Sequence, residues 1–154
     1  MTKIKQKYYK RLEQDLYNYK YLKLSIYNIR KDIADFQGDD GVSAINFDKI
    51  QISSTNAFSS IVENASLANI EKIDFLEHCM NRADSVISKI DKAMELLEAK
   101  ENKVIRLYYI DNQEWFNVAY HLHYNERWCR EIRSKAMRKM AIAIYGETAV
   151  IEPT

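Results

Sequence analysis

The chain has 154 residues and a mass of 18.2 kDa, with 23 basic side chains, 22 acidic ones and 47% hydrophobic residues. This length suffices for one domain or two small ones, whose core needs neither metal nor disulfide. Only three Gly and one Pro are present, so there is little of the turn chemistry that a sandwich, barrel or parallel sheet normally requires. The composition predicts an all-α fold and disfavours an all-β or doubly wound one.

The net charge of +1 conceals a segregation of charge along the chain. Residues 1–36 carry nine basic and four acidic side chains, whereas residues 37–101 carry six and twelve. Residues 127–139 then hold six basic side chains against Glu131 alone. Because a charged partner responds to the field within about 10 Å, a near-neutral total does not exclude a polyanion such as DNA.

Cysteine usage and hydropathy bear on the compartment in which the protein works. Cys79 and Cys129 have no cysteine neighbours, which fits a reducing compartment better than a disulfide framework. The first residues lack the apolar run of a signal peptide, and no later stretch approaches eighteen apolar residues. We therefore expect a cytoplasmic protein with no membrane partner.

The first predicted element is a helix with one apolar stripe. From Tyr19 to Phe36 the apolar residues alternate at spacings of three and four, and Tyr8, Leu12 and Leu16 extend the same face less regularly. Gly38 and Gly41 predict the end of this helix. We interpret residues 37–56 as a connector, in which Ser54 or Asn56 is a candidate cap for the next helix.

A second long helix is predicted from a similar stripe. Its apolar positions, again three and four apart, are Ile73, Leu76, Met80, Ala83, Ile87, Ile90, Met94 and Leu97. Two heptad stripes predict coiled-coil pairing, as an antiparallel hairpin within one chain, as a dimer seam between chains, or as both. An ordinary amphipathic core helix is equally compatible with the pattern. We expect residues 1–100 to form a helical hairpin or coiled-coil oligomerisation region, and the protein to be a homodimer.

Residues 101–146 read as three short helices with two tight connections, followed by a tail at 147–154. Val118, Ala119 and Leu122, then Cys129 and Ile132, stand where a helix-turn-helix requires small or apolar side chains. Asn125 is a competent amino-terminal cap for the second of these helices. The spacing therefore predicts a helix-turn-helix DNA-binding domain.

The outer face of that second helix is the predicted DNA-contacting surface. A helix fits the major groove of B-form DNA, and its early residues reach the base edges. The predicted base-reading residues are Glu126, Arg127, Trp128, Arg130 and Glu131, and the predicted phosphate-binding residues are Arg133, Lys135, Arg138 and Lys139. Any one of these cations alone would be interpreted as a solvated surface charge. Their grouping on one helix favours DNA.

About forty-five residues of this region resemble region four of bacterial sigma factors and the phage regulators that share its helix-turn-helix. The similarity is carried by Cys129-Arg130-Glu131-Ile132, by Lys135-Ala136-Met137-Arg138-Lys139-Met140, and upstream by Val104-Ile105-Arg106-Leu107-Tyr108-Tyr109. The resemblance implies that Glu126, Arg127, Arg130 and Glu131 read bases, that Lys135 and Arg138 lie nearer the backbone, and that the module contacts RNA polymerase. This chain departs from the family at two positions. It has Asn112, which tolerates a left-handed backbone, where Gly is common, and Trp128 where a polar residue is usual.

The order of parts along the whole chain resembles the RinA and ArpU type of phage late-gene transcriptional regulators. That resemblance implies a phage or prophage origin and a role in switching on transcription. We therefore expect a sequence-specific double-stranded DNA-binding transcriptional regulator. The alternatives are a DNA-packaging recognition subunit similar to a small terminase, and a coiled-coil adaptor that binds RNA polymerase without DNA affinity and uses Trp128 as an anchor.

The sequence offers no catalytic or metal-binding pattern. His121, His123 and Cys129 lack the four-ligand spacing of a structural zinc site. The neighbouring His78 and Cys79 would project to different sides of a helix, and the three glycines form no phosphate-binding loop. We expect no enzymatic activity, no cofactor and no metal.

Overall fold

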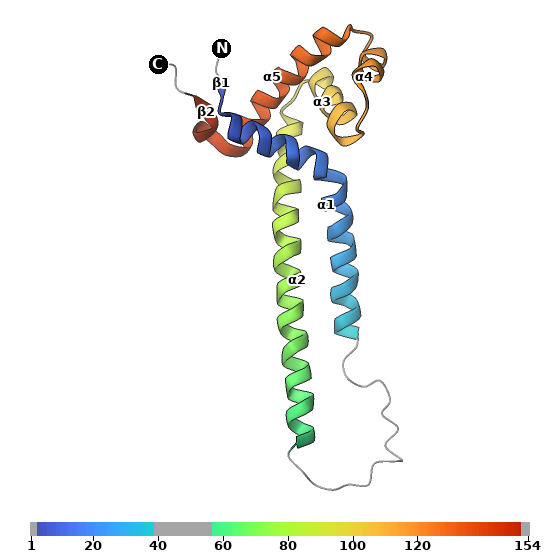
Figure 1. Cartoon of the computed structure of the whole chain (residues 1–154), viewed down its shortest axis with the longest axis vertical. Coiled ribbons are helices and arrows are strands. Elements are labelled where there is room, and N and C mark those ends of the chain that lie inside the picture. Colours follow the sequence, from blue (N-terminus) through green and yellow to red (C-terminus); the bar gives the residue numbers. More distant parts are fainter. Residues whose placement is uncertain (1–2, 39–56, 152–154) are drawn as a thin grey trace. The chain divides into compact units, whose positions relative to one another are not determined.

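A computed structural model describes residues 3–38 and 57–151, with only the helical backbone for 57–66. The order is β1 (Lys3–Ile4), α1 (Gln6–Gly38), α2 (Ala57–Glu95), α3 (Ala99–Ile105), a π-helical turn η2 (Arg106–Ile110), α4 (Trp115–Leu122), α5 (Glu126–Tyr145), a 3-10 turn η3 (Gly146–Ala149) and β2 (Val150–Ile151) (Figure 1). The predicted all-α fold is confirmed. None of the described helices has the length and apolar character that a membrane span requires. From residue 39 on, the predicted connector and its cap candidates Ser54 and Asn56 lie outside the described residues.

The chain divides into two compact units, one made of Met1–Lys23 and Asp84–Thr154 and the other of Leu24–Ala83. This division differs from the sequence-based boundary at residue 100, because it groups the beginning of α1 and the end of α2 with the helix-turn-helix. The physical reason lies in the core of the first unit. Leu12 and Leu16 of α1 are fully buried there, as are Val104 and Ile105 of α3.

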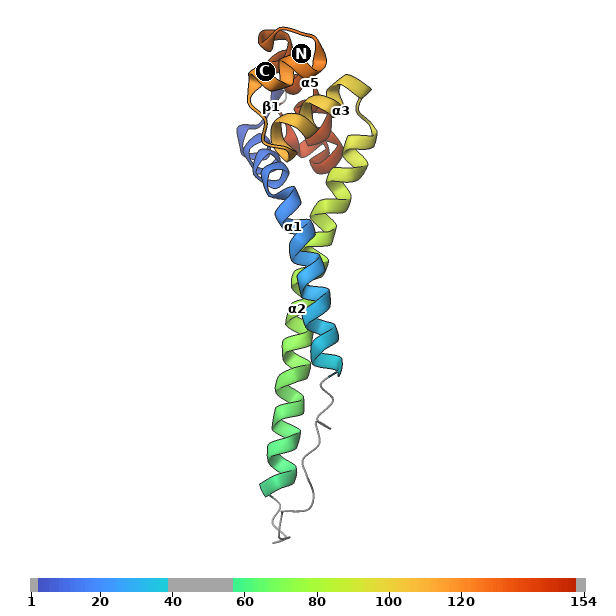
Figure 2. The same cartoon turned by 90° about the vertical axis from the view of Figure 1, so that its right-hand side faces the viewer.

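The second unit is a pair of helical segments from α1 and α2 that run side by side (Figures 1 and 2). The ammonium of Lys72 lies 4.4 Å from the centre of the Phe36 ring, which joins the two segments. Ile26, Ile33 and Ala83 are buried within the single chain. The parts of the predicted stripes that lie in this unit therefore face its inside, as the hairpin alternative requires, and the homodimer stays a prediction.

In the first unit, the beginning of α1 and the end of α2 pack with α3, η2, α4 and α5. The buried side chains that they share include Leu12, Leu16, Tyr19, Ile90, Met94, Val104, Ile105, Met137, Met140 and Ala141. The Tyr19 hydroxyl donates a hydrogen bond to Asp91, which joins α1 to α2 within this unit. Burying each large apolar side chain contributes about 1.5–3 kcal/mol, which makes this core the main source of stability in the unit.

The two ends of the chain meet in a short antiparallel ribbon in the first unit. Lys3 pairs with Ile151 and Ile4 with Val150. The Lys5 backbone amide donates to the Ala149 carbonyl at 2.8 Å, and the Lys5 ammonium donates to the Thr148 carbonyl at 3.0 Å. The sequence predicted only a tail at residues 147–154. Residues 146–151 are instead ordered by η3 and by this pairing.

Candidate nucleic-acid interface

The helix-turn-helix consists of α4, a turn at residues 123–125, and α5. Its core is the buried set Val104, Val118, Cys129 and Ile132, against which Leu107, Tyr108, Trp115, Ala119 and Leu122 pack. The inward positions predicted from the spacing are therefore confirmed. Burial raises the pKa of the Cys129 thiol, so this side chain stays protonated and serves as a small apolar group in the core.

The turn before α5 is fixed by local hydrogen bonds. His123 adopts a left-handed backbone conformation with φ of 56°, and its amide donates to the Tyr120 carbonyl at 3.3 Å. The Asn125 side chain accepts a hydrogen bond from the Trp128 amide at 2.8 Å. This confirms the predicted cap, an interaction that is typically worth about 1 kcal/mol. The start of α5 is thus held in place by its own sequence.

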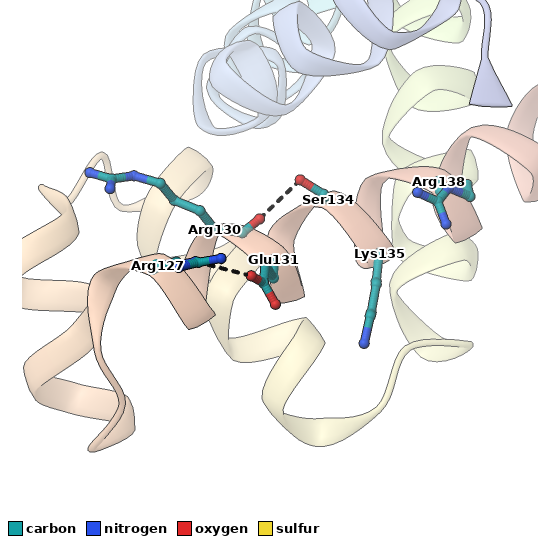
Figure 3. A pocket seen from close by; sticks show the side chains of 6 residues that line it. All are labelled: Arg127, Arg130, Glu131, Ser134, Lys135 and Arg138. Carbon is teal, nitrogen blue, oxygen red and sulfur yellow. Dashed lines mark hydrogen bonds and ion pairs between the residues drawn. The ribbon is translucent and has the colours of Figure 1, made fainter. Parts of the chain in front are cut away.

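Four of the predicted cations lie along one open face of α5. They line a hollow of about 430 Å³ whose residues are Arg127, Arg130, Glu131, Ser134, Lys135 and Arg138 (Figure 3). The Arg127 side chain is 89% exposed, and Arg130 and Lys135 are also exposed. We call this surface, defined by those six residues, the α5 face. It offers four positive charges against one carboxylate, a balance suited to a polyanion.

Ion pairs one helical turn apart steady the first two arginines. Arg130 lies 2.9 Å from the carboxylate of Glu126, and Arg127 lies 3.6 Å from that of Glu131. Arg130 also lies over the Trp115 ring, 5.3 Å from its centre. Exposed pairs of this spacing are worth only about 0.3–0.5 kcal/mol. They orient the guanidinium groups and are weak enough to open for another anion.

Lys139 does not join the α5 face. Its ammonium lies 2.8 Å from the Glu101 carboxylate and 3.7 Å from that of Glu98, both near the start of α3. The hydrogen bond to Glu101 raises the pKa of Lys139. Glu101 is only 4% exposed and also accepts a hydrogen bond from the Glu98 backbone amide at 3.0 Å. The structure therefore separates Lys139 from the other predicted phosphate-binding residues.

Arg133 also faces the fold more than the solvent. Its guanidinium carbon lies 5.2 Å from the centre of the Trp115 ring and 5.6 Å from that of Tyr108. These two rings stack on each other with their centres 4.1 Å apart. The Arg133 Nε is buried and has no hydrogen-bond partner within the described part of the chain. Arg133 thus connects α5 to the aromatic side chains of η2 and α4, a packing role that its spacing in the sequence does not reveal.

A family model described as a protein of unknown function, DUF722, matches residues 8–142, which is most of the chain. The chain belongs to the DUF722 family. The matched range includes all of α4 and most of α5. No curated protein and no solved structure matches this DUF722 chain.

A second hollow in this DUF722 protein, of about 550 Å³, lies beside the start of α5. It is lined by Tyr17, Tyr108, Asn112, Gln113, Glu114, Trp115, Phe116 and Glu126. Asn112 has φ of 51°, the left-handed conformation that its tolerance for this backbone predicts. The lining includes two carboxylates and no cation, so it is unsuited to a phosphate group. Among the described residues, no cluster of His, Cys, Asp and Glu side chains is arranged to hold a metal ion.

Proposed function

We propose that this DUF722 protein is a sequence-specific double-stranded DNA-binding transcriptional regulator, in which α5 enters the major groove. The observation that carries the proposal is the α5 face. One side of α5 is buried in a helix-turn-helix core, and the opposite side presents Arg127, Arg130, Lys135 and Arg138 to solvent around one hollow. A helix with this division of faces is the element that such motifs insert into DNA.

Arg127 and Arg130 lie within the first turn and a half of α5, the part of a recognition helix that reaches base edges. An arginine fork binds the O6 and N7 atoms of guanine with two hydrogen bonds. Arg130 is steadied by Glu126 and Trp115 before any DNA arrives, so less side-chain entropy is lost on binding. Glu126 and Glu131 are acceptors for a cytosine amino group. Trp128 lies beside the same surface, with its ring centre 5.5 Å from the ammonium of Lys135.

The resemblance to region four of sigma factors supports a phage or prophage regulator that contacts RNA polymerase as well as DNA. Phe116 and Tyr120 of α4 are 70% and 71% exposed, one helical turn apart. Exposed aromatic side chains of this kind commonly anchor protein interfaces. They favour, as the second candidate, an adaptor that binds polymerase without DNA affinity.

Selection of bound sequences from a random pool of duplex DNA tests the proposal. We expect enrichment of one motif, and a loss of about 1–3 kcal/mol of base discrimination in Arg127→Ala and in Arg130→Ala. Lys89→Ala is the matched control, because Lys89 is exposed on α2 and lines neither hollow. Failure to enrich any motif, or unchanged discrimination in both arginine variants, would reject the proposal.

Two further measurements separate the alternatives. Capture of RNA polymerase by a protein that binds no duplex would favour the adaptor. Assemblies of eight or more chains in light scattering would favour the DNA-packaging subunit.

A further inference from the structure

A hollow of about 260 Å³ lies next to the α5 face in the first unit. It is lined by Lys3, Ile4, Tyr9, Ser134 and Arg138. Ser134 and Arg138 also line the hollow of the α5 face, so the two hollows adjoin along α5. The smaller one combines a cation from each of two elements, Lys3 of β1 and Arg138 of α5, and no carboxylate lines it.

The backbone that carries Lys3 is held in place. Lys3 pairs with Ile151 and Ile4 with Val150, and the next residue, Lys5, is tied to Ala149 and Thr148 by its amide and its ammonium. The Lys5 ammonium is therefore directed to the Thr148 carbonyl. The Lys3 side chain is exposed and has no ion-pair partner within residues 3–38 and 57–151. The ribbon therefore fixes the backbone position from which the Lys3 side chain extends.

The length of α5 decides which part of DNA this hollow meets. Arg127 and Arg138 are eleven residues apart, which is about 16 Å along a helix at 1.5 Å per residue. The major groove is about 12 Å wide. With Arg127 and Arg130 at the bases, Arg138 then lies at the wall of the groove, where the phosphates run. Lys3 shares its hollow with Arg138, so in this arrangement it would lie at the same wall.

We propose that the hollow between β1 and α5 binds a DNA backbone phosphate, with Lys3 and Arg138 as its two cationic ligands. This inference rests on the proposed function, because it assigns a further contact to the same duplex. It makes the paired chain ends part of the DNA-binding surface, and it replaces Lys139 with Lys3 as a phosphate-binding residue. A phosphate contact adds affinity on every sequence and carries no base preference.

The test is a salt titration of DNA binding by the full chain, with the selected duplex and with an unrelated duplex. In Lys3→Ala we expect the slope of log affinity against log salt to fall by about one. Both duplexes should be weakened by the same factor, and the selected motif should not change. Lys89→Ala removes one exposed charge elsewhere and should keep the wild-type slope beyond a small general effect. Lys3→Arg should restore binding.

The outcomes are distinguishable. A wild-type slope in Lys3→Ala overturns this inference and leaves the proposed function in place. Weaker binding to the selected duplex alone also overturns it, because base reading would then be the role of Lys3. If the wild-type protein binds no duplex, the proposed function fails and the inference fails with it. Lys3→Gln keeps most of the side-chain stem. If Lys3→Ala and Lys3→Gln both melt at the temperature of the wild type, the ribbon is intact in both variants.

Discussion

The charged side chains of α5 differ in the groups that they contact. On the open side, Arg127 and Lys135 face solvent and have only weak partners. Away from that side, Lys139 is paired with Glu101 of α3, whereas Arg133 lies against Trp115 of α4 and Tyr108 of η2. All four come from one basic stretch of sequence. Charge density alone therefore does not identify DNA-contacting residues, because partners from distant segments, such as Glu101 and Tyr108, hold some of the cations away from the open side.

The largest contrast should appear when a core residue of α5 is compared with one on its open face. Ile132 is 3% exposed in the core of the helix-turn-helix. Ile132→Ala should lower the free energy of unfolding by about 2–5 kcal/mol, because it removes buried methyl groups and leaves a cavity. Arg127→Ala should change it by no more than about 0.5 kcal/mol. Urea unfolding measures both, and equal losses would contradict the assigned faces.

A smaller contrast is expected between two carboxylates that pair with α5 cations. Glu101→Ala removes both the partner of Lys139 and the acceptor for the Glu98 amide. We expect the free energy of unfolding to fall by about 1–3 kcal/mol. Its matched control is Glu131→Ala, which breaks only the exposed pair with Arg127 and should cost about 0.5 kcal/mol or less.

For DNA binding, the order of the two variants should be the reverse of their order for stability. At a temperature where both variants are folded, Glu131→Ala should alter the affinity for duplex DNA, whereas Glu101→Ala should not. Salt titration of duplex binding checks this. A gain of DNA affinity in Glu101→Ala without unfolding would place the Lys139 charge in the DNA-binding surface after all, because the ammonium released from Glu101 would then be contacting DNA.

Local spacing was sufficient to predict much of this unit. Asn125 caps α5, Cys129 and Ile132 face the core, and Asn112 adopts a left-handed conformation, because each depends on residues within one or two turns. The inward stripes of α1 and α2 follow from the period of a helix in the same way.

The remaining features depend on contacts between distant residues. Glu101 and Lys139 are 38 positions apart, and nothing in the basic stretch itself singles out Lys139. The pairing of Lys3 with Ile151 joins opposite ends of the chain through two-residue strands, which are too short to show a periodic pattern. The sequence therefore predicted the candidate site as one face of a helix. Which residues belong to that face depends on contacts that form only in the folded unit.

The smallest contrast concerns buried and exposed tyrosines of the first unit. The Tyr109 hydroxyl donates to a Glu13 carboxylate oxygen at 2.8 Å, and burial raises the pKa of Tyr109. An unfolded tyrosine loses its proton near pH 10, whereas folded Tyr109 keeps it to higher pH. The stability that this group contributes is therefore complete below about pH 10 and falls as the pH rises further.

Tyr109→Phe tests this linkage. At pH 7 the variant should be less stable by about 0.5–1.5 kcal/mol, because the hydrogen bond to Glu13 is lost. Above pH 10 the difference from wild type should shrink, because Tyr109 ionises in the unfolded wild-type chain and the variant has no hydroxyl there to ionise. Urea unfolding at pH 7, 9 and 10.5 measures the difference. Tyr21→Phe is the control, since Tyr21 is 74% exposed, and it should differ little from wild type at each pH. A gap for Tyr109→Phe that stays constant to pH 10.5 would show that the Tyr109 hydroxyl reaches solvent.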